Sequence, residues 1–278
     1  MSAATPLFAD DLTFIRRLIR DRSAIVLDES KDYLLEARLG PIAEKEGLGS
    51  LRELIAELRK APSSSLSKRV VDAMTTNETS FYRDIAPFDC LKQKVLPEVM
   101  AARASSRKLD LWCGASSSGQ EPYSILILLK DSFPELETWN LRLLATDLSS
   151  NMVERTREGQ YTQLEVNRGM PAKLMVKYFD RKGMKWQVKP DVRKLLEARE
   201  MNLIDRWPPM GKMDIVFLRN VLIYFDVPTK AAILGKIKNI LAPDGFLFLG
   251  GAETTIGVDD SFERIEFPNA SCYRLRAG

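Results

Sequence analysis

Short apolar strands alternate with helices from about residue 105 onward, and this rhythm limits the folds open to the chain more than any other feature. Strands that are apolar throughout, rather than at every second position, are typical of parallel sheets covered by helices on both faces. The segments with this character are 108–113, 141–146, 213–218 and 246–249. Segments 262–267 and 271–275 flank Pro268-Asn269 and predict an antiparallel pair that closes the sheet. The sequence therefore predicts an α/β fold for this part of the chain.

The first 75 residues follow a different pattern, in which apolar positions recur every three or four residues as in amphipathic helices. Ser50 and Glu53 form a capping box at the start of one such helix, and Gly47 suits the end of the helix before it. No strand pattern is evident here. We expect a small all-helical domain over residues 1–75.

Arginines crowd this helical segment. Arg16, Arg17 and Arg20 lie close together, and Arg38 follows on the next expected helix. Such a run is either the solvated face of a helix or a docking surface for an acidic partner. The sequence leaves both interpretations open.

The chain contains no histidine among its 278 residues. This excludes Ser-His-Asp and Cys-His nucleophile systems and zinc sites that need imidazole, and we expect no metal. Its three cysteines (Cys90, Cys113 and Cys272) are far apart and fit a reducing compartment. The formal net charge of +3 is too small to favour a nucleic-acid partner. With no apolar run of about 18 residues and no signal-like start, the sequence predicts a cytoplasmic protein that does not insert into a membrane.

A loop of small residues and an acid follow the first two expected strands. Residues 114–119 read GASSSG, and Asp147 ends the second strand. Small residues let the backbone approach a ligand closely, and an acid at this place can accept both hydroxyls of a ribose. Alternatively, the loop is only a tight connection and Asp147 only caps the next helix. Together they favour an adenosine-containing ligand, with dinucleotides and S-adenosylmethionine as the leading candidates.

Longer motifs carry a resemblance to a known family. They are TTNETSFYRD at 75–84, WCGASSSGQEPYS at 112–124, ATD at 145–147, LRNVLIYFD at 218–226 and LGGAE at 249–253. This set resembles the CheR family of S-adenosylmethionine-dependent methyltransferases that act on bacterial chemoreceptors. The resemblance runs from about Tyr33 to the C-terminus.

The resemblance implies a class I (Rossmann-like) methyltransferase sheet, preceded by an all-helical domain and interrupted by a small antiparallel β-subdomain. The expected divisions are a helical domain over 1–75 that recognises the receptor, a junction segment over 76–90 that reaches the cofactor, and a methyltransferase domain over 91–278. We expect the inserted subdomain at about 174–201, where KWQVK and RKLLEARE can form short strands, although RKLLEARE also suits a helix.

The same resemblance assigns site residues by motif position. Those expected to bind the cofactor are Asn77, Thr79, Arg83, Glu121, Asp147, Asn202, Leu203, Arg219 and Asn220. Asp147 is expected at the ribose. Arg83 and Tyr224 are expected beside the transferred methyl group, although Tyr224 can also be read as a buried aromatic residue. Arg16, Arg17, Arg20 and Arg38 become candidates for docking the helical methylation region of a receptor.

The implied reaction transfers a methyl group to a receptor glutamate and releases S-adenosylhomocysteine. A glutamate carboxyl has an ordinary pKa of about 4.3, so this nucleophile is ionised at neutral pH and needs no base. The absence of histidine is therefore compatible with the chemistry.

The loop at 180–184 is short, whereas relatives that tether to a receptor's C-terminal pentapeptide have a longer, glycine-richer loop there. The sequence predicts independence from such a tether. Two other functions stay open: a class I methyltransferase with another substrate, such as RNA or a small acid, and a non-catalytic adaptor that binds the cofactor or its demethylated product as a signal.

Overall fold

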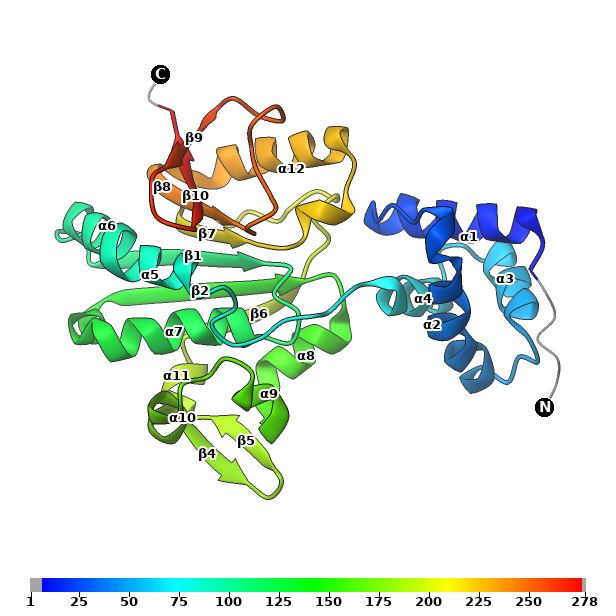
Figure 1. The fold of residues 1–278 in the computed structure, drawn as a ribbon, viewed down its shortest axis with the longest axis horizontal. Helices are drawn as coiled ribbons and strands as arrows, with labels where there is room; N and C mark the ends of the chain where they lie inside the picture. The colour runs from blue at the N-terminus through cyan, green and yellow to red at the C-terminus, as the bar shows by residue number, and fades with distance from the viewer. Residues whose placement is uncertain (1–6, 277–278) are drawn as a thin grey trace. The chain divides into compact units, whose positions relative to one another are not determined.

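The structure of the protein is a computed structural model, which describes residues 7–276. The chain divides into two compact units (Figure 1). The first runs as far as Thr76 and includes Tyr224–Asp226, and the second comprises Asn77–Ile223 and the chain from Val227 onward. Each unit has its own hydrophobic core.

The first unit is helical, as predicted. Its elements are α1 (Ala9–Ser23), η1 (Glu29–Lys31), α2 (Asp32–Lys45), α3 (Leu51–Lys60) and α4 (Ser65–Met74). The Ser50 side chain accepts a hydrogen bond from the Glu53 N–H at 3.2 Å, which confirms Ser50 as the N-cap of α3. The return bond of the predicted capping box differs, because the Glu53 carboxylate accepts from the Gly49 N–H at 2.9 Å and not from the Ser50 N–H. Gly47 has a φ of +71°, the left-handed conformation expected after a helix. Leucine and isoleucine side chains from the four α-helices, such as Ile15, Leu39 and Leu54, form the core of this unit.

The second unit contains a seven-stranded sheet in the order β6-β2-β1-β7-β8-β10-β9. Its strands are β1 (Lys108–Gly114), β2 (Asn140–Asp147), β6 (Leu196–Glu200), β7 (Met213–Leu218), β8 (Leu241–Leu249), β9 (Phe262–Ile265) and β10 (Ser271–Leu275). The first five in spatial order are parallel, and β10 and β9 add to the edge of β8 in antiparallel pairing. The predicted parallel sheet with an antiparallel close is confirmed.

Helices pack against this sheet and cover it from solvent. They are α5 (Ala86–Cys90), η2 (Leu91–Val95), α6 (Leu96–Ala102), α7 (Gln120–Ser132), η3 (Pro134–Thr138), α8 (Ser150–Glu158) and α12 (Val227–Ile240). The short η4 (Leu222–Tyr224) spans the division between the two units. All residues of β7 are buried, as are all of β1 after its first residue, which agrees with strands covered on both faces.

A small antiparallel sheet in the order β3-β5-β4 is inserted between α8 and β6. The insertion comprises β3 (Gln160–Thr162), α9 (Gln163–Asn167), α10 (Ala172–Tyr178), β4 (Phe179–Lys182), β5 (Lys185–Val188) and α11 (Pro190–Arg193). Helix α7 contacts α11, and Figure 1 shows the small sheet beyond α7 as seen from the main sheet.

The expected strands in this region need one correction. KWQVK does contribute β5, but the second stretch contributes β6, which pairs in parallel with β2 at the edge of the main sheet. The small sheet gains its third strand earlier, at Gln160. An edge strand has exposed positions, and β6 buries only Ala198 fully, so its sequence lacks the apolar run that marks the other parallel strands.

None of the helices within residues 7–276 is long and apolar enough to cross a lipid bilayer.

Candidate functional site

The loop after β1 has an unusual backbone at the carboxyl edge of the sheet. Ala115, Ser117 and Gly119 have φ values of +52°, +49° and +92°. A Cβ atom on Gly114 would lie 2.8 Å from Leu218 Cδ1 in β7, so a larger residue here would displace that side chain. The left-handed residues turn the loop sharply, and they bring the Ser117 N–H within 2.7 Å of Asp147 Oδ2.

Asp147, at the end of β2, is the acid that this loop surrounds. Its Oδ2 accepts from the Ser117 N–H and its Oδ1 accepts from the Ser149 N–H at 2.9 Å. Burial raises the pKa of Asp147, while the backbone hydrogen bonds act in the opposite direction. Ser149, not Asp147, is the N-cap residue of α8. The Leu148 N–H also lowers the pKa of Asp147, and a carboxylate has about four acceptor positions, so at least one remains for a hydroxyl group of a ligand.

The chain after β6 runs beside this acid. The Met201 N–H donates to the Asp147 carbonyl at 2.9 Å, which places the predicted Asn202 and Leu203 at the same edge. The Leu203 carbonyl accepts from Trp207 Nε1 at 3.1 Å and from Lys236 Nζ at 3.0 Å. These contacts fix the backbone of the segment beside Asp147.

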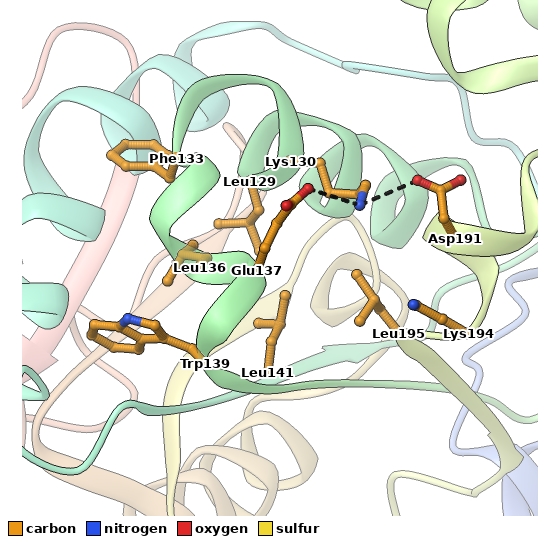
Figure 2. A pocket seen from close by; sticks show the side chains of 10 residues that line it. All are labelled: Leu129, Lys130, Phe133, Leu136, Glu137, Trp139, Leu141, Asp191, Lys194 and Leu195. Carbon is orange, nitrogen blue, oxygen red and sulfur yellow. Dashed lines mark ion pairs between the residues drawn. The ribbon is translucent and has the colours of Figure 1, made fainter.

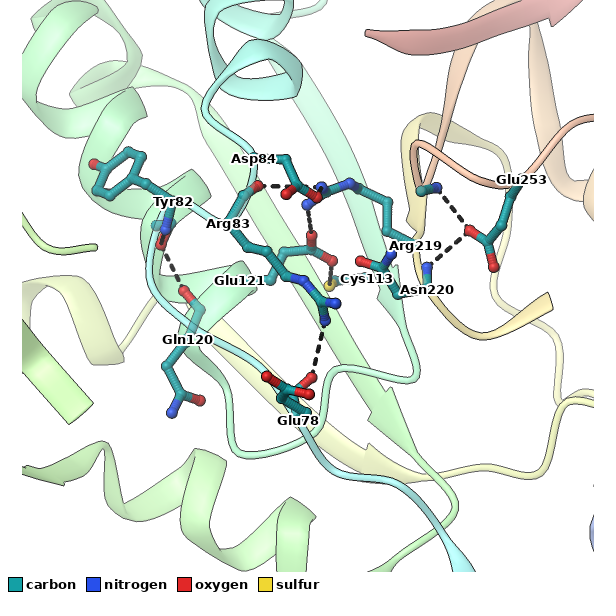
Figure 3. A network of polar contacts seen from close by, with 12 residues as sticks. Glu78, Tyr82, Arg83, Asp84, Cys113, Gln120, Glu121, Arg219, Asn220 and Glu253 are labelled. Atoms are coloured by element: carbon teal, nitrogen blue, oxygen red, sulfur yellow. Dashed lines mark hydrogen bonds and ion pairs between the residues drawn. The ribbon is translucent and has the colours of Figure 1, made fainter. Parts of the chain in front are cut away.

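The junction segment is held against the same edge. The Asn77 carbonyl accepts from the Ser117 hydroxyl at 2.9 Å, and the Tyr82 N–H donates to Ser124 Oγ at 3.0 Å. Thr79 lies on the chain between these two anchors. The Arg83 guanidinium donates to the Glu78 carbonyl at 3.0 Å, as Figure 3 shows.

Arg219, directly after β7, is the centre of a buried ion network (Figure 3). Its Nη1 donates to Glu121 Oε1 at 2.5 Å, and its Nη2 donates to Asp84 Oδ2 at 2.9 Å and to the Arg83 carbonyl at 3.1 Å. The Cys113 thiol donates to the other Glu121 oxygen at 3.3 Å. The Arg219 side chain is 1% exposed. Glu121 and Arg219, both predicted to bind the cofactor, therefore bind each other and fix the backbone that carries Arg83.

The same arginine leaves one donor unused. Arg219 Nε is buried and has no hydrogen-bond partner among the described residues. Buried donors are almost always satisfied, so Arg219 Nε is a candidate donor to a bound ligand.

Asn220 comes next and has a φ of +58°. Its N–H donates to Glu253 Oε2 at 2.8 Å, from the loop after β8 (Figure 3). Glu253 is a further residue of the site, to which the sequence motifs assign no role. Its sequence signal is its place at the end of the LGGAE motif, shortly after a strand end and two glycines.

Tyr224 and the candidate docking arginines belong to the helical unit. The Tyr224 carbonyl accepts from the Val26 N–H at 3.1 Å. Arg16 forms an ion pair with Asp32 at 2.6 Å, and Arg38 donates to the carbonyls of Met74 and Thr75 at 3.0 and 2.9 Å. These two arginines thus support the helical unit itself.

The remaining two docking candidates are more exposed. Arg20 pairs with Asp226 at 2.9 Å, with 62% of its side chain exposed. Arg17 lies 3.5 Å from Asp21, with 81% of its side chain exposed. Of the four, Arg17 and Arg20 are the ones most accessible to a partner.

A separate cavity of about 360 Å³ lies where α7 ends and β2 begins (Figure 2). It is lined by Leu129, Lys130, Phe133, Leu136, Glu137, Trp139, Leu141, Asp191, Lys194 and Leu195. Lys130 lies between Glu137 and Asp191, at 3.6 and 3.2 Å. None of the predicted site residues lines this cavity, and Leu141 is at the amino end of its strand. The cavity therefore lies at the opposite edge of the sheet from Asp147.

The carboxyl edge has the chemistry that S-adenosylmethionine requires. Asp147 offers acceptor positions for ribose hydroxyls, Arg219 Nε offers a buried donor, and the loop at 114–119 brings backbone close to a ligand. Within the described ranges, no three His, Cys, Asp or Glu side chains gather as metal ligands would.

Comparisons with known proteins agree with this arrangement. Residues 77–270 match the family model of the CheR methyltransferase SAM binding domain, and residues 10–75 match that of the CheR methyltransferase all-alpha domain. The chain is 40% identical to chemotaxis protein methyltransferase Cher2 of Pseudomonas putida, over 96% of this chain and 98% of that protein. It is also 40% identical to chemotaxis protein methyltransferase 1 of Pseudomonas aeruginosa, over 99% and 100% of the two chains. A chemotaxis protein methyltransferase of Vibrio parahaemolyticus is 39% identical over 94% of each.

Proposed function

The chain belongs to the CheR methyltransferase family, and we propose that it transfers methyl groups from S-adenosylmethionine to glutamate side chains of chemoreceptors. The observation that carries the proposal is the match of both domains to this family, together with 40% identity to chemotaxis protein methyltransferases over nearly the whole chain. The products would be glutamyl methyl esters and S-adenosylhomocysteine.

The cofactor, when bound, supplies an electrophilic methyl group on a positively charged sulfur. Asp147 would hold the ribose, and Asn202 and Leu203 would contact the adenosine from the chain beside it. Asn77 and Thr79 would approach from the junction segment, whose backbone Ser117 anchors at Asn77. Glu121, Arg219 and Asn220 would complete the site.

The acceptor needs no proton removed, because a glutamate carboxyl with a pKa of about 4.3 is ionised at neutral pH. Catalysis then depends on holding the carboxylate oxygen in line with the methyl group, and positioning of this kind is worth up to about 7–11 kcal/mol in favourable systems. A chain without histidine can supply this.

Arg83 and Tyr224 are the residues that we assign to this positioning. One Nη of Arg83 is used by the Glu78 carbonyl, which leaves other guanidinium N–H groups for the incoming carboxylate or the cofactor. We assign to the Tyr224 hydroxyl the role of donating a hydrogen bond that orients the carboxylate. Arg83 should orient the acceptor carboxylate without forming a tight ion pair with it, because full neutralisation of the carboxylate would weaken it as a nucleophile.

The partner that we propose is the helical, acidic methylation region of a receptor in the cytoplasm. The helical unit would recognise it, with the exposed guanidinium groups of Arg17 and Arg20 as the main contacts. Arg16 and Arg38 would contribute less, since both are used in contacts within the unit.

The direct test is methyl transfer from methyl-tritiated S-adenosylmethionine to receptor-containing membranes. We expect labelled receptor that releases volatile methanol under mild base, as a methyl ester does. Arg83→Ala and Tyr224→Phe should lower turnover, and Lys92→Ala, on the exposed side of η2, serves as a control. Full activity in both site variants would remove these residues from the mechanism. A chain that binds S-adenosylhomocysteine but leaves every receptor unlabelled would favour the adaptor.

We also propose that activity does not depend on a pentapeptide tether. The hairpin between β4 and β5 turns through only Gly183 and Met184, so it offers little loop for a peptide to bind. Calorimetry with a receptor tail pentapeptide should give no binding. Selective binding in that experiment would overturn this part of the proposal.

A further inference from the structure

Glu253 gathers three backbone N–H groups from the carboxyl edge of the sheet. Its Oε2 accepts from Asn220 at 2.8 Å and from Gly250 at 2.6 Å, and its Oε1 accepts from Ile223 at 3.2 Å. Glu253 is 6% exposed. Two of the three donors lie in the loop after β7 and the third follows β8, so one carboxylate ties two neighbouring strand ends together.

The surrounding backbone is shaped for this contact. A Cβ atom on Gly250 would lie 2.7 Å from Glu253 Oε2 and 2.7 Å from Asn220 Nδ2, so only glycine fits there without a shift. Asn220 has a positive φ, which turns its N–H toward the carboxylate. The bonds from Asn220 and Ile223 bracket the loop that begins at Arg219 and leads to Tyr224.

We propose that Glu253 is a positioning residue for methyl transfer, which sets the conformation of the loop from Arg219 to Tyr224. It touches neither reactant. It acts through Ile223, whose N–H it holds immediately before Tyr224, and through Asn220, which follows Arg219. This inference rests on the proposed function for its kinetic part only.

The substitution Glu253→Gln distinguishes the bonds that Oε2 accepts, from Asn220 and Gly250, from the bond that Oε1 accepts, from Ile223. A glutamine has one carbonyl oxygen, which can keep the bonds from Asn220 and Gly250, while its amide NH₂ would face the Ile223 N–H. The substitution therefore releases the residue before Tyr224 with little change in volume. Glu263→Gln is the matched control, since it makes the same chemical change at an exposed ion pair with Arg274.

The experiment uses the full chain and three measurements on each variant. They are amide hydrogen exchange of the segment 219–226, calorimetric affinity for S-adenosylhomocysteine, and kcat and KM on receptor membranes. For Glu253→Gln we expect faster exchange at Ile223, affinity within about threefold of the parent, and a kcat lower by roughly 10- to 100-fold, as small misplacements cause in other enzymes. Glu263→Gln should match the parent in all three.

Two results would overturn the proposal. One is parent-like exchange and kcat in Glu253→Gln. The other is a lower kcat that is fully explained by a lower melting temperature and by a matching decrease in ligand-binding stoichiometry. That pattern indicates a purely structural role. A parent chain that binds S-adenosylhomocysteine yet labels no receptor would refute the proposed function instead, and the exchange rates would still decide whether Glu253 holds the loop.

Discussion

Two buried carboxylates at the same edge of the sheet are used in different ways. Asp147 and Glu253 are each 6% exposed, and each accepts backbone N–H groups from loops that follow parallel strands. Asp147 accepts from Ser117 and Ser149 on the β1 and β2 side, and the Leu148 N–H also lowers its pKa, whereas Glu253 accepts three groups from the β7 and β8 side. Even with these donors, burial outweighs them at Asp147 and raises its pKa.

The surroundings of each carboxylate decide whether it binds a ligand or supports the loops. Burial raises the pKa of Asp147, which means that its charge is poorly compensated until something else satisfies it. Glu253 is surrounded by donors of the chain itself. We expect Asp147 to contribute mainly to ligand affinity and Glu253 mainly to the stability and shape of the loops.

The substitution that should lower stability most is Glu253→Ala. It leaves three backbone N–H groups without an acceptor, of which the Gly250 N–H is buried and those of Asn220 and Ile223 are partly buried. A buried unsatisfied donor costs about 1–3 kcal/mol and a partly exposed one less, so the free energy of unfolding should fall by roughly 2–4 kcal/mol. Asp147→Ala should lower it by only about 1–2 kcal/mol, because loss of a poorly compensated charge offsets part of the damage. Urea unfolding followed by circular dichroism measures both.

If Glu253→Ala and Asp147→Ala lowered the free energy of unfolding equally, the proposed difference between a supporting and a ligand-binding carboxylate would be wrong. Glu263→Ala is the control for the loss of a carboxylate from the surface, where an exposed ion pair contributes about 0–1 kcal/mol.

The next effect is on affinity, from Asp147→Asn. The amide keeps the size of the side chain but loses the charge that strengthens hydrogen bonds to ribose hydroxyls. Bonds to charged groups are worth about 1.5–3 kcal/mol, so affinity for S-adenosylhomocysteine should fall by roughly 10- to 100-fold in calorimetry. Unchanged affinity in this variant would show that Asp147 does not hold the ligand.

The smallest effect is on the pH dependence of binding. Because burial raises the pKa of Asp147, the folded, ligand-free protein takes up a proton at higher pH than the unfolded chain does. As the pH falls through that raised pKa, the group's contribution to stability rises while ligand affinity weakens by a few-fold. The shift in melting temperature that S-adenosylhomocysteine causes should therefore shrink as the pH is lowered from 7 through that raised pKa. Asp147→Asn should show a flat dependence, and a parent protein with a flat dependence would contradict the assignment.

Much of the fold is predictable from local patterns. The N-cap at Ser50 and the apolar strands β1, β2 and β7 are visible in consecutive residues. Strand β6 is not, because its place is set by pairing with β2 some fifty residues earlier, and an edge strand with charged residues has the pattern of a helix. Its assignment needs tertiary information.

The site is predictable to a smaller extent. Motifs place Asp147 and Arg219 at strand ends, and the structure brings both to one edge. That Arg219 pairs with Glu121, and that Arg38 caps α4, depends on contacts between distant segments. The LGGAE motif contains Glu253, but its contacts are not visible there, since two of its three donors lie about thirty residues away.

Cys113 lies below this edge, with its thiol against Glu121 and no exposure to solvent. Burial and the nearby carboxylate raise the pKa of Cys113 well above its usual range. Alkylating reagents and oxidants attack the thiolate, so the sulfur is inert while the domain stays closed. The rate at which a thiol reagent modifies Cys113 therefore reports how often the Arg219–Glu121 pair comes apart. Thiol modification of Cys113 thus measures the rate of local opening at this site.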